Sequence, residues 1–181
     1  MELTPVRNSF GTSVYKTENG TVIKMKKGSG SVQVSDQGTI TVTGGENVKI
    51  RGTNGDDRII AQNSHIKTVN GVCGQDHLFF NGCKFNDYNM FWGTGSAIHT
   101  GISRSKEDDF TEVVIKGDFN GAIFAQQGSG KGYGDDSKAH KDKTMVFGDN
   151  KGHIQVDTHD KVMVKGQKGH IFNQTVYVVP V

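Results

Sequence analysis

Two short stretches of the chain place acidic and amide side chains beside glycines, in a pattern that suits a hard cation. They are RGTNGDDRIIAQ, residues 51–62, and GVCGQDHLF, residues 71–79. Calcium in proteins takes oxygen ligands from carboxylates and from backbone carbonyls. Glycine lets the backbone turn tightly enough to point carbonyls at an ion, and the aspartates supply negative charge. A glycine-rich turn without metal would use the same residues, so both interpretations stay open at this point.

Residues 52–60 and 71–79 resemble the hemolysin-type calcium-binding nonapeptide, or RTX repeat, G-G-x-G-x-D-x-U-x, where U is a large apolar residue. Both stretches keep the first and fourth glycines, the aspartate and the apolar eighth residue, and both lack the second glycine. The nonapeptide between them, AQNSHIKTV, has lost every motif residue. The resemblance is therefore to a degenerate repeat.

The resemblance implies a parallel β-roll in which two nonapeptides make one coil. Asp57 and Asp76 are separated by about one coil, so they would face one structural calcium from successive coils. By the same analogy, backbone carbonyls complete the ligand shell, and they are those of Gly52, Asn54, Asp56, Gly71, Cys73 and Gln75. Cys73 also lies one strand period before Cys83, and the two could form a disulfide or remain two buried thiols.

A second group of polar residues lies in the glycine-rich segment 127–142. Enzymes that act on acidic polysaccharides need a lysine or another base, with carboxylates or calcium to neutralise the uronate. The catalytic candidates are Asp135, Asp136, His140 and Lys141. Charged residues in such a segment are also typical of a solvated loop, so this chemistry is an alternative rather than the main prediction.

Aromatic residues gather around residue 85. A row of rings can stack on sugars, but it is equally typical of a core or of an apolar seam. The residues are Phe79, Phe80, Phe85, Tyr88, Phe91 and Trp92.

The elements that position these residues are predicted to be strands. Short β-branched runs, from SVQV at 31 to TVYVV at 175, recur every eight to twelve residues except across the segments 93–111 and 127–142, and clusters of Gly, Asn, Asp or Ser follow them. No window has the apolar periodicity of a helix, so the fold class is all-β. An antiparallel sandwich or barrel fits such runs, and so does a solenoid. The short runs and the 25 glycines favour a parallel β-solenoid, a right-handed β-helix or β-roll with two long edge loops.

We expect residues 1–181 to form a single domain. Residues 1–20 would cap the stack or be loose, and the segments 93–111 and 127–142 would be insertions without strands. The two parts of the solenoid would be 21–92 and 112–181.

The overall charge and hydropathy exclude some partners. The chain has 21 Lys and Arg against 19 Asp and Glu, a formal charge of +2, which argues against a nucleic-acid surface. No apolar run is long enough to predict a membrane span. The first twenty residues lack the pattern of a Sec signal peptide, so export would need another route.

These observations predict a secreted or surface-acting bacterial β-solenoid that binds a protein or polysaccharide partner. The resemblance to the RTX repeat adds the expectation of one structural calcium. One alternative is a lyase or epimerase on uronate polymers. The other is a host-directed effector or a virion spike protein. The sequence leaves the oligomeric state open.

Overall fold

The computed structural model describes residues 5–9, 12–18, 20–33, 38–71, 74–100, 110–125, 142–156 and 160–172. Every regular element among them is a β-strand, so the predicted all-β class is confirmed. The strands are β1 (Pro5–Ser9), β2 (Thr12–Thr17), β3 (Gly20–Gln33), β4 (Gly38–Arg51), β5 (Asp57–Gln62), β6 (His65–Asn70), β7 (Gln75–Asn81), β8 (Lys84–Phe85), β9 (Ala97–His99), β10 (Phe110–Lys116), β11 (Ala122–Phe124), β12 (Lys143–Val146), β13 (His153–Gln155), β14 (Lys161–Val164) and β15 (His170–Phe172).

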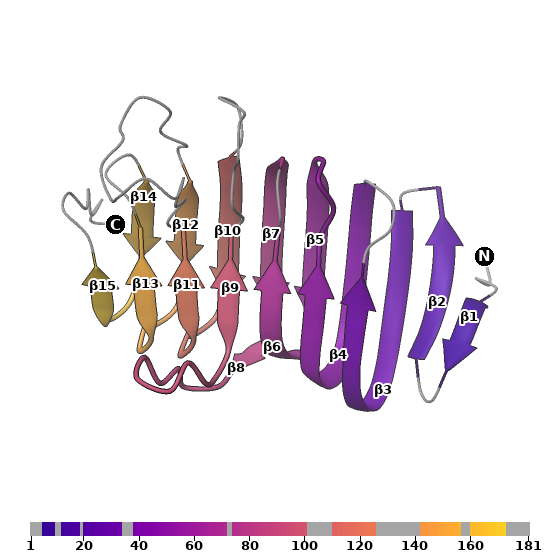
Figure 1. Cartoon of the computed structure of the whole chain (residues 1–181), viewed down its shortest axis with the longest axis horizontal. Helices are drawn as coiled ribbons and strands as arrows, with labels where there is room; N and C mark the ends of the chain where they lie inside the picture. Colours follow the sequence, from indigo (N-terminus) through magenta and orange to yellow (C-terminus); the bar gives the residue numbers. More distant parts are fainter. Residues whose placement is uncertain are drawn as a thin grey trace.

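These strands form one curled sheet that is parallel from β3 onwards (Figure 1). The chain alternates between two rows of strands. The first ladder runs from the amino-terminal part of β4 through β5, β7, β10, β12 and β14. The second ladder runs from the carboxyl-terminal part of β4 through β6, β9, β11, β13 and β15. Because β4 belongs to both ladders, the sheet is continuous across the bend.

Alternation of apolar and polar residues decides which face of each strand is inside. In β7, for example, Leu78 and Phe80 are buried whereas His77 and Asn81 are exposed. Inward residues of both ladders form one apolar cluster, in which the ring of Phe85 packs edge-on against Phe80. Burial of such rows is the main favourable contribution to folding.

The first strands close one edge of the sheet. β1 pairs antiparallel with β2, and β2 pairs antiparallel with β3 (Figure 1). An unpaired edge strand would expose a row of backbone N–H and C=O groups. Strand β2 therefore covers the edge of β3, and β1 covers the edge of β2.

The predicted boundaries of the first insertion are wrong. Residues 97–99 form β9, and residues 110 and 111 already belong to β10. The insertion that the structure describes is the segment 86–96, because β8 and β9 on either side of it both pair with β6. A strand as short as β9 gives almost no periodic signal. The segments 101–109 and 126–141 and the run TVYVV lie outside the described residues.

Candidate functional site

The two motif-bearing turns lie against each other at the start of the first ladder. Strand β5 pairs with β7 in the register Arg58 to His77, and the backbone N–H of Gln75 donates to Oδ1 of Asp56 over 2.9 Å. A Cβ atom on Gly74, which has φ of +110°, would lie 2.6 Å from the carbonyl carbon of Gly55. Glycine is therefore required at position 74, where the turn before β7 passes close to the backbone of Gly55 in the turn before β5.

Asp57 and Asp76 are neighbours on these strands, and both are buried. The N–H of Asp57 donates to Oδ1 of Asp76 over 3.0 Å. Oδ2 of Asp57 accepts the N–H of Thr53 over 2.5 Å, and the Thr53 hydroxyl lies 3.0 Å from the same oxygen. Oδ1 of Asp57 is buried with no hydrogen-bond partner. Burial raises the pKa of the Asp57 carboxyl, because a charge removed from water is disfavoured.

The same arrangement continues along the ladder. The strand register aligns five buried side chains in one row, which we call the carboxylate column: Asp57, Asp76, Thr111, Asp142 and Asp160. Asp142 Oδ1 accepts the N–H of Thr111 over 2.7 Å, and Asp160 Oδ1 accepts the N–H of Asp142 over 2.9 Å. Three times, therefore, a carboxylate accepts a backbone N–H at or next to the start of the preceding strand in the ladder.

Sequence reasoning missed Asp142 and Asp160, although a signal was present. Each aspartate of the column is followed by a basic residue or histidine and then by a β-branched residue or leucine that begins the inward row of the strand. The four stretches read DRII at 57, DHLF at 76, DKTM at 142 and DKVM at 160. This short pattern marks the start of a first-ladder strand more reliably than the glycines do, because the glycines of 52–57 have no counterpart before Asp142.

The predicted calcium ligands can be compared with this geometry. Calcium needs about six to eight oxygens. One oxygen each of Asp57 and Asp76 already accepts a backbone N–H. The remaining Asp57 oxygen is orphaned and buried, and a Cβ on Gly52 would lie 2.6 Å from the Gly71 carbonyl oxygen and 2.7 Å from Asp57 Oδ2.

Two carboxylates and a glycine-lined backbone thus lie at one place. They provide part of the oxygen shell that calcium needs. Among the residues that the structure describes, no group of three or more His, Cys, Asp or Glu side chains is arranged around a possible metal position. Gly52, Asn54, Asp56, Gly71 and Gln75 all lie in the stacked turns, whereas Cys73 lies outside the described residues.

The four catalytic candidates stay predictions. Asp135, Asp136, His140 and Lys141 all lie outside the described residues. Cys83 is a free thiol whose Sγ donates to the carbonyl oxygen of Ala61 over 3.3 Å. Burial raises the pKa of this thiol, so it is a poor nucleophile at neutral pH.

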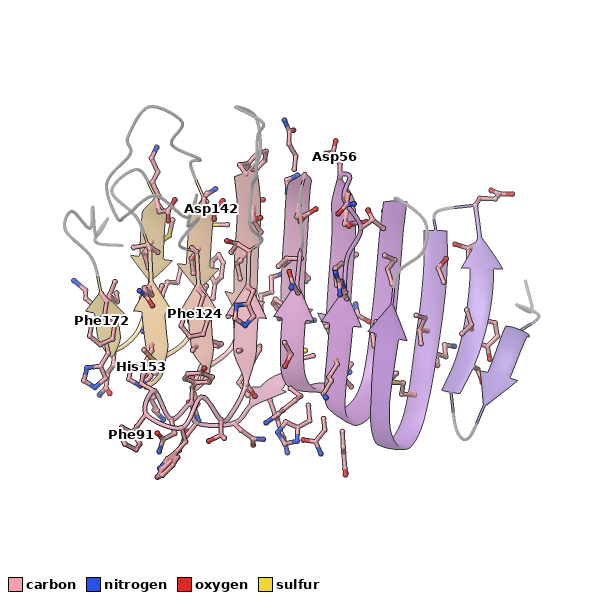
Figure 2. All side chains as sticks on the ribbon, viewed as in Figure 1. Asp56, Phe91, Phe124, Asp142, His153 and Phe172 are labelled. Atoms are coloured by element: carbon pink, nitrogen blue, oxygen red, sulfur yellow. The ribbon has the colours of Figure 1, made fainter. Side chains whose placement is uncertain are left out.

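The predicted aromatic group separates into core and surface. Phe80 and Phe85 are core residues, Phe79 and Tyr88 are half-buried, and Phe91 and Trp92 are exposed. We call residues 89–94, in the insertion between β8 and β9, the aromatic turn. Figure 2 shows Phe91 on the segment that runs along one border of the sheet.

Hydrogen bonds hold the aromatic turn in shape. Oδ1 of Asn89 accepts the N–H groups of Phe91 and Trp92 over 3.0 and 3.1 Å, and the N–H of Asn89 donates to the carbonyl of Thr94 over 2.7 Å. Phe91 is 83% exposed and Trp92 is 71% exposed, and their rings meet edge to face at 4.8 Å. The turn thus fixes its backbone while presenting two large rings to solvent.

Comparison of the chain with protein-family models, with curated proteins and with solved structures gives no match. Among the described residues, no helix is long and apolar enough to cross a membrane.

Proposed function

We propose that the curled sheet is a two-sided parallel β-solenoid and that the protein is a surface-acting binding protein for a carbohydrate polymer. Each coil would contribute one strand to each ladder, with 18 or 19 residues per coil where no insertion occurs. The protein would act outside the cell or at its surface, and the insertions would carry the contacts with the partner.

The observation that supports this proposal is the aromatic turn. Large rings held exposed on a hydrogen-bonded backbone bind at low entropic cost, because the conformation is already fixed. Asp87 is the charged residue nearest to the turn in sequence, and its other neighbours offer amide and hydroxyl groups. This combination of ring faces with uncharged hydrogen-bonding groups suits a sugar better than an ionic ligand.

The test is migration in native gels that contain hydroxyethyl cellulose, xylan, alginate or no polymer. We expect at least one polymer to retard the protein, and Trp92→Ala to weaken that binding at least tenfold, since a hot-spot aromatic is worth about 2 kcal/mol. Phe172→Ala is the matched control, because Phe172 is 48% exposed on β15, outside the insertion.

Equal loss in both variants, or no retardation by any polymer, would reject the sugar-binding role. Production of unsaturated uronate in the alginate arm would instead indicate a lyase. The chain has one tryptophan, so the emission of Trp92 reports binding at the turn directly.

We further propose that one structural calcium binds beside Asp57 and Asp76. Support comes from the orphaned Asp57 oxygen and from two adjacent buried carboxylates, whose mutual repulsion a cation would relieve. Calcium that binds only the folded chain must raise the melting temperature in a concentration-dependent way. Melting in calcium and in chelator, with Asp57→Ala and Asp76→Ala as variants, tests this directly. An identical melt in both buffers would rule the ion out.

A further inference from the structure

The outward face of the first ladder carries an apolar row that no other described segment is seen to cover. The register aligns one residue from each of five successive strands, and we call this row the outer column: Ile60, Phe79, Val114, Met145 and Met163. All five are half-buried, whereas the residues that alternate with them, such as Ile59 and Leu78, are fully buried in the interior. The row is therefore a surface feature and not part of the core.

Cationic side chains flank the outer column on both sides. The row on one side is Arg58, His77, Glu112, Lys143 and Lys161. The row on the other side is Gln62, Asn81, Lys116, Phe147 and Lys165.

Five of these ten residues are lysine or arginine, and Glu112 is the one carboxylate among them. Glu112 is already engaged by Lys143 over 3.0 Å and by His77 over 3.2 Å. Lys116 and Lys165 lie over the rings of Phe79 and Phe147, at 5.3 and 4.9 Å from the centroids. The two rows that flank the outer column thus carry a net positive charge, which is complementary to carboxylates on a partner.

The spacing of the column distinguishes between kinds of partner. Successive residues of the column lie on neighbouring strands, roughly 4.8 Å apart. A helix that presents an apolar residue every three or four positions advances about 5.3 Å between them. An extended strand advances about 6.7 Å between residues on one face, so it loses register within two steps. Over four steps the helix differs from the column by only about 2 Å.

We propose that the outer column is the docking face for an amphipathic α-helix of another protein, whose apolar stripe is bordered by Glu or Asp. A second copy of this chain is a poor occupant, because it would bring a second set of cations to the same face. A flat bilayer is also a poor fit, since the apolar groups are half-buried between long cationic side chains. This surface is separate from the aromatic turn, so the two proposals can fail independently.

The test uses two synthetic peptides of about five helical turns with the same leucine stripe, one flanked by glutamate and one by lysine. Fluorescence anisotropy should give the glutamate peptide an affinity at least tenfold higher than the lysine peptide, and this preference should shrink in high salt. Met145→Glu should weaken the binding of the glutamate peptide at least tenfold. Gln155→Glu is the matched control, because Gln155 is half-buried on the second ladder, and it should have no effect.

Several outcomes would overturn the proposal. These are equal binding of the two peptides, an unchanged affinity in Met145→Glu, or an equal loss in Gln155→Glu. Binding to phosphatidylglycerol vesicles without binding to the glutamate peptide would assign the surface to a membrane. Self-association that Met145→Glu abolishes would assign it to a second copy.

Discussion

The two ladders have the same parallel pairing and the same inward apolar rows, but their outward faces differ. The outer column of the first ladder is apolar, half-exposed and bordered by cations. The equivalent face of the second ladder carries two alanines, Ala97 and Ala122, which are 7% and 0% exposed, and beyond them a series of rings. At Ala97 and Ala122 the second face is thus buried, whereas every residue of the outer column on the first face stays partly exposed.

Rings of the second ladder cover one another. His99 stacks on Phe124 with centroids 5.1 Å apart, and His153 stacks on His170 at 5.2 Å. Tyr88, from the insertion between β8 and β9, packs edge-on against Phe124 at 5.5 Å. Figure 2 shows Phe124, His153 and Phe172 along this series of strands. Packing therefore constrains the inward rows of both ladders to apolar residues, whereas the outward rows differ in composition and exposure from one ladder to the other.

The largest expected effect comes from placing a charge on each outward face. Ala122→Asp should destabilise the protein by about 3 kcal/mol or more, because the new carboxylate is buried and crowded. Val114→Asp should cost only about 1 kcal/mol, near the range of strand propensities, because solvent reaches that position. Urea denaturation followed by circular dichroism measures both. Equal losses of unfolding free energy in the two variants would show that the two outward faces are equally shielded from solvent.

A smaller effect is expected from Asp57→Asn at the start of the first ladder. The raised pKa of Asp57 means that its ionised form opposes folding above that pKa, and that protonation on acidification restores stability. In chelator near neutral pH, the amide should therefore stabilise the fold by on the order of 1 kcal/mol. The gain should shrink as the pH falls towards 3.8, the ordinary pKa of an aspartate, because the raised pKa lets the wild-type carboxyl take up its proton in the folded state. If Asp57→Asn is less stable than wild type near pH 7, then groups around Asp57 stabilise its negative charge and the expected gain is wrong.

The smallest effect is expected at His99 on the second ladder. Acidification lowers stability through His99, whereas it raises stability through Asp57. Burial lowers the pKa of His99 below its ordinary value of 6.5, so the stability it contributes is complete above that value and is lost as the pH falls below it. His99→Phe keeps the ring stack and should reduce the loss of stability as the pH falls below 6.5, the ordinary pKa of histidine. Parallel melting curves of wild type and variant check this. An unchanged pH profile would mean that another group causes the acid response.

Glu112 provides a control for the first ladder. Hydrogen bonding to Lys143 lowers the pKa of this carboxyl, so its contribution is present at neutral pH and is lost only as the pH falls below its ordinary value of 4.5. Asp57 and Glu112 therefore respond to acid with opposite signs within one ladder, and Asp57→Asn should leave the Glu112 response intact.

Much of the fold could be predicted from the sequence. The all-β class follows from runs such as DRII and DHLF, in which alternate residues are apolar. The spacing of Asp57 and Asp76 placed them one coil apart, and in the structure they lie on neighbouring strands. Asp142 and Asp160 were not predicted, because they lack the glycines that drew attention to the first two. β9 was missed because three residues carry no measurable period.

The sequence by itself determined the strand class, the inward apolar rows and the turns that need glycine, because these depend on residues close together in the chain. Only the tertiary structure decided that four aspartates and a threonine form one buried column. Only the tertiary structure also placed five outward apolar residues in line between cations. Those neighbours are 18 to 35 residues apart, and the register of each strand pair depends on how the whole interior packs.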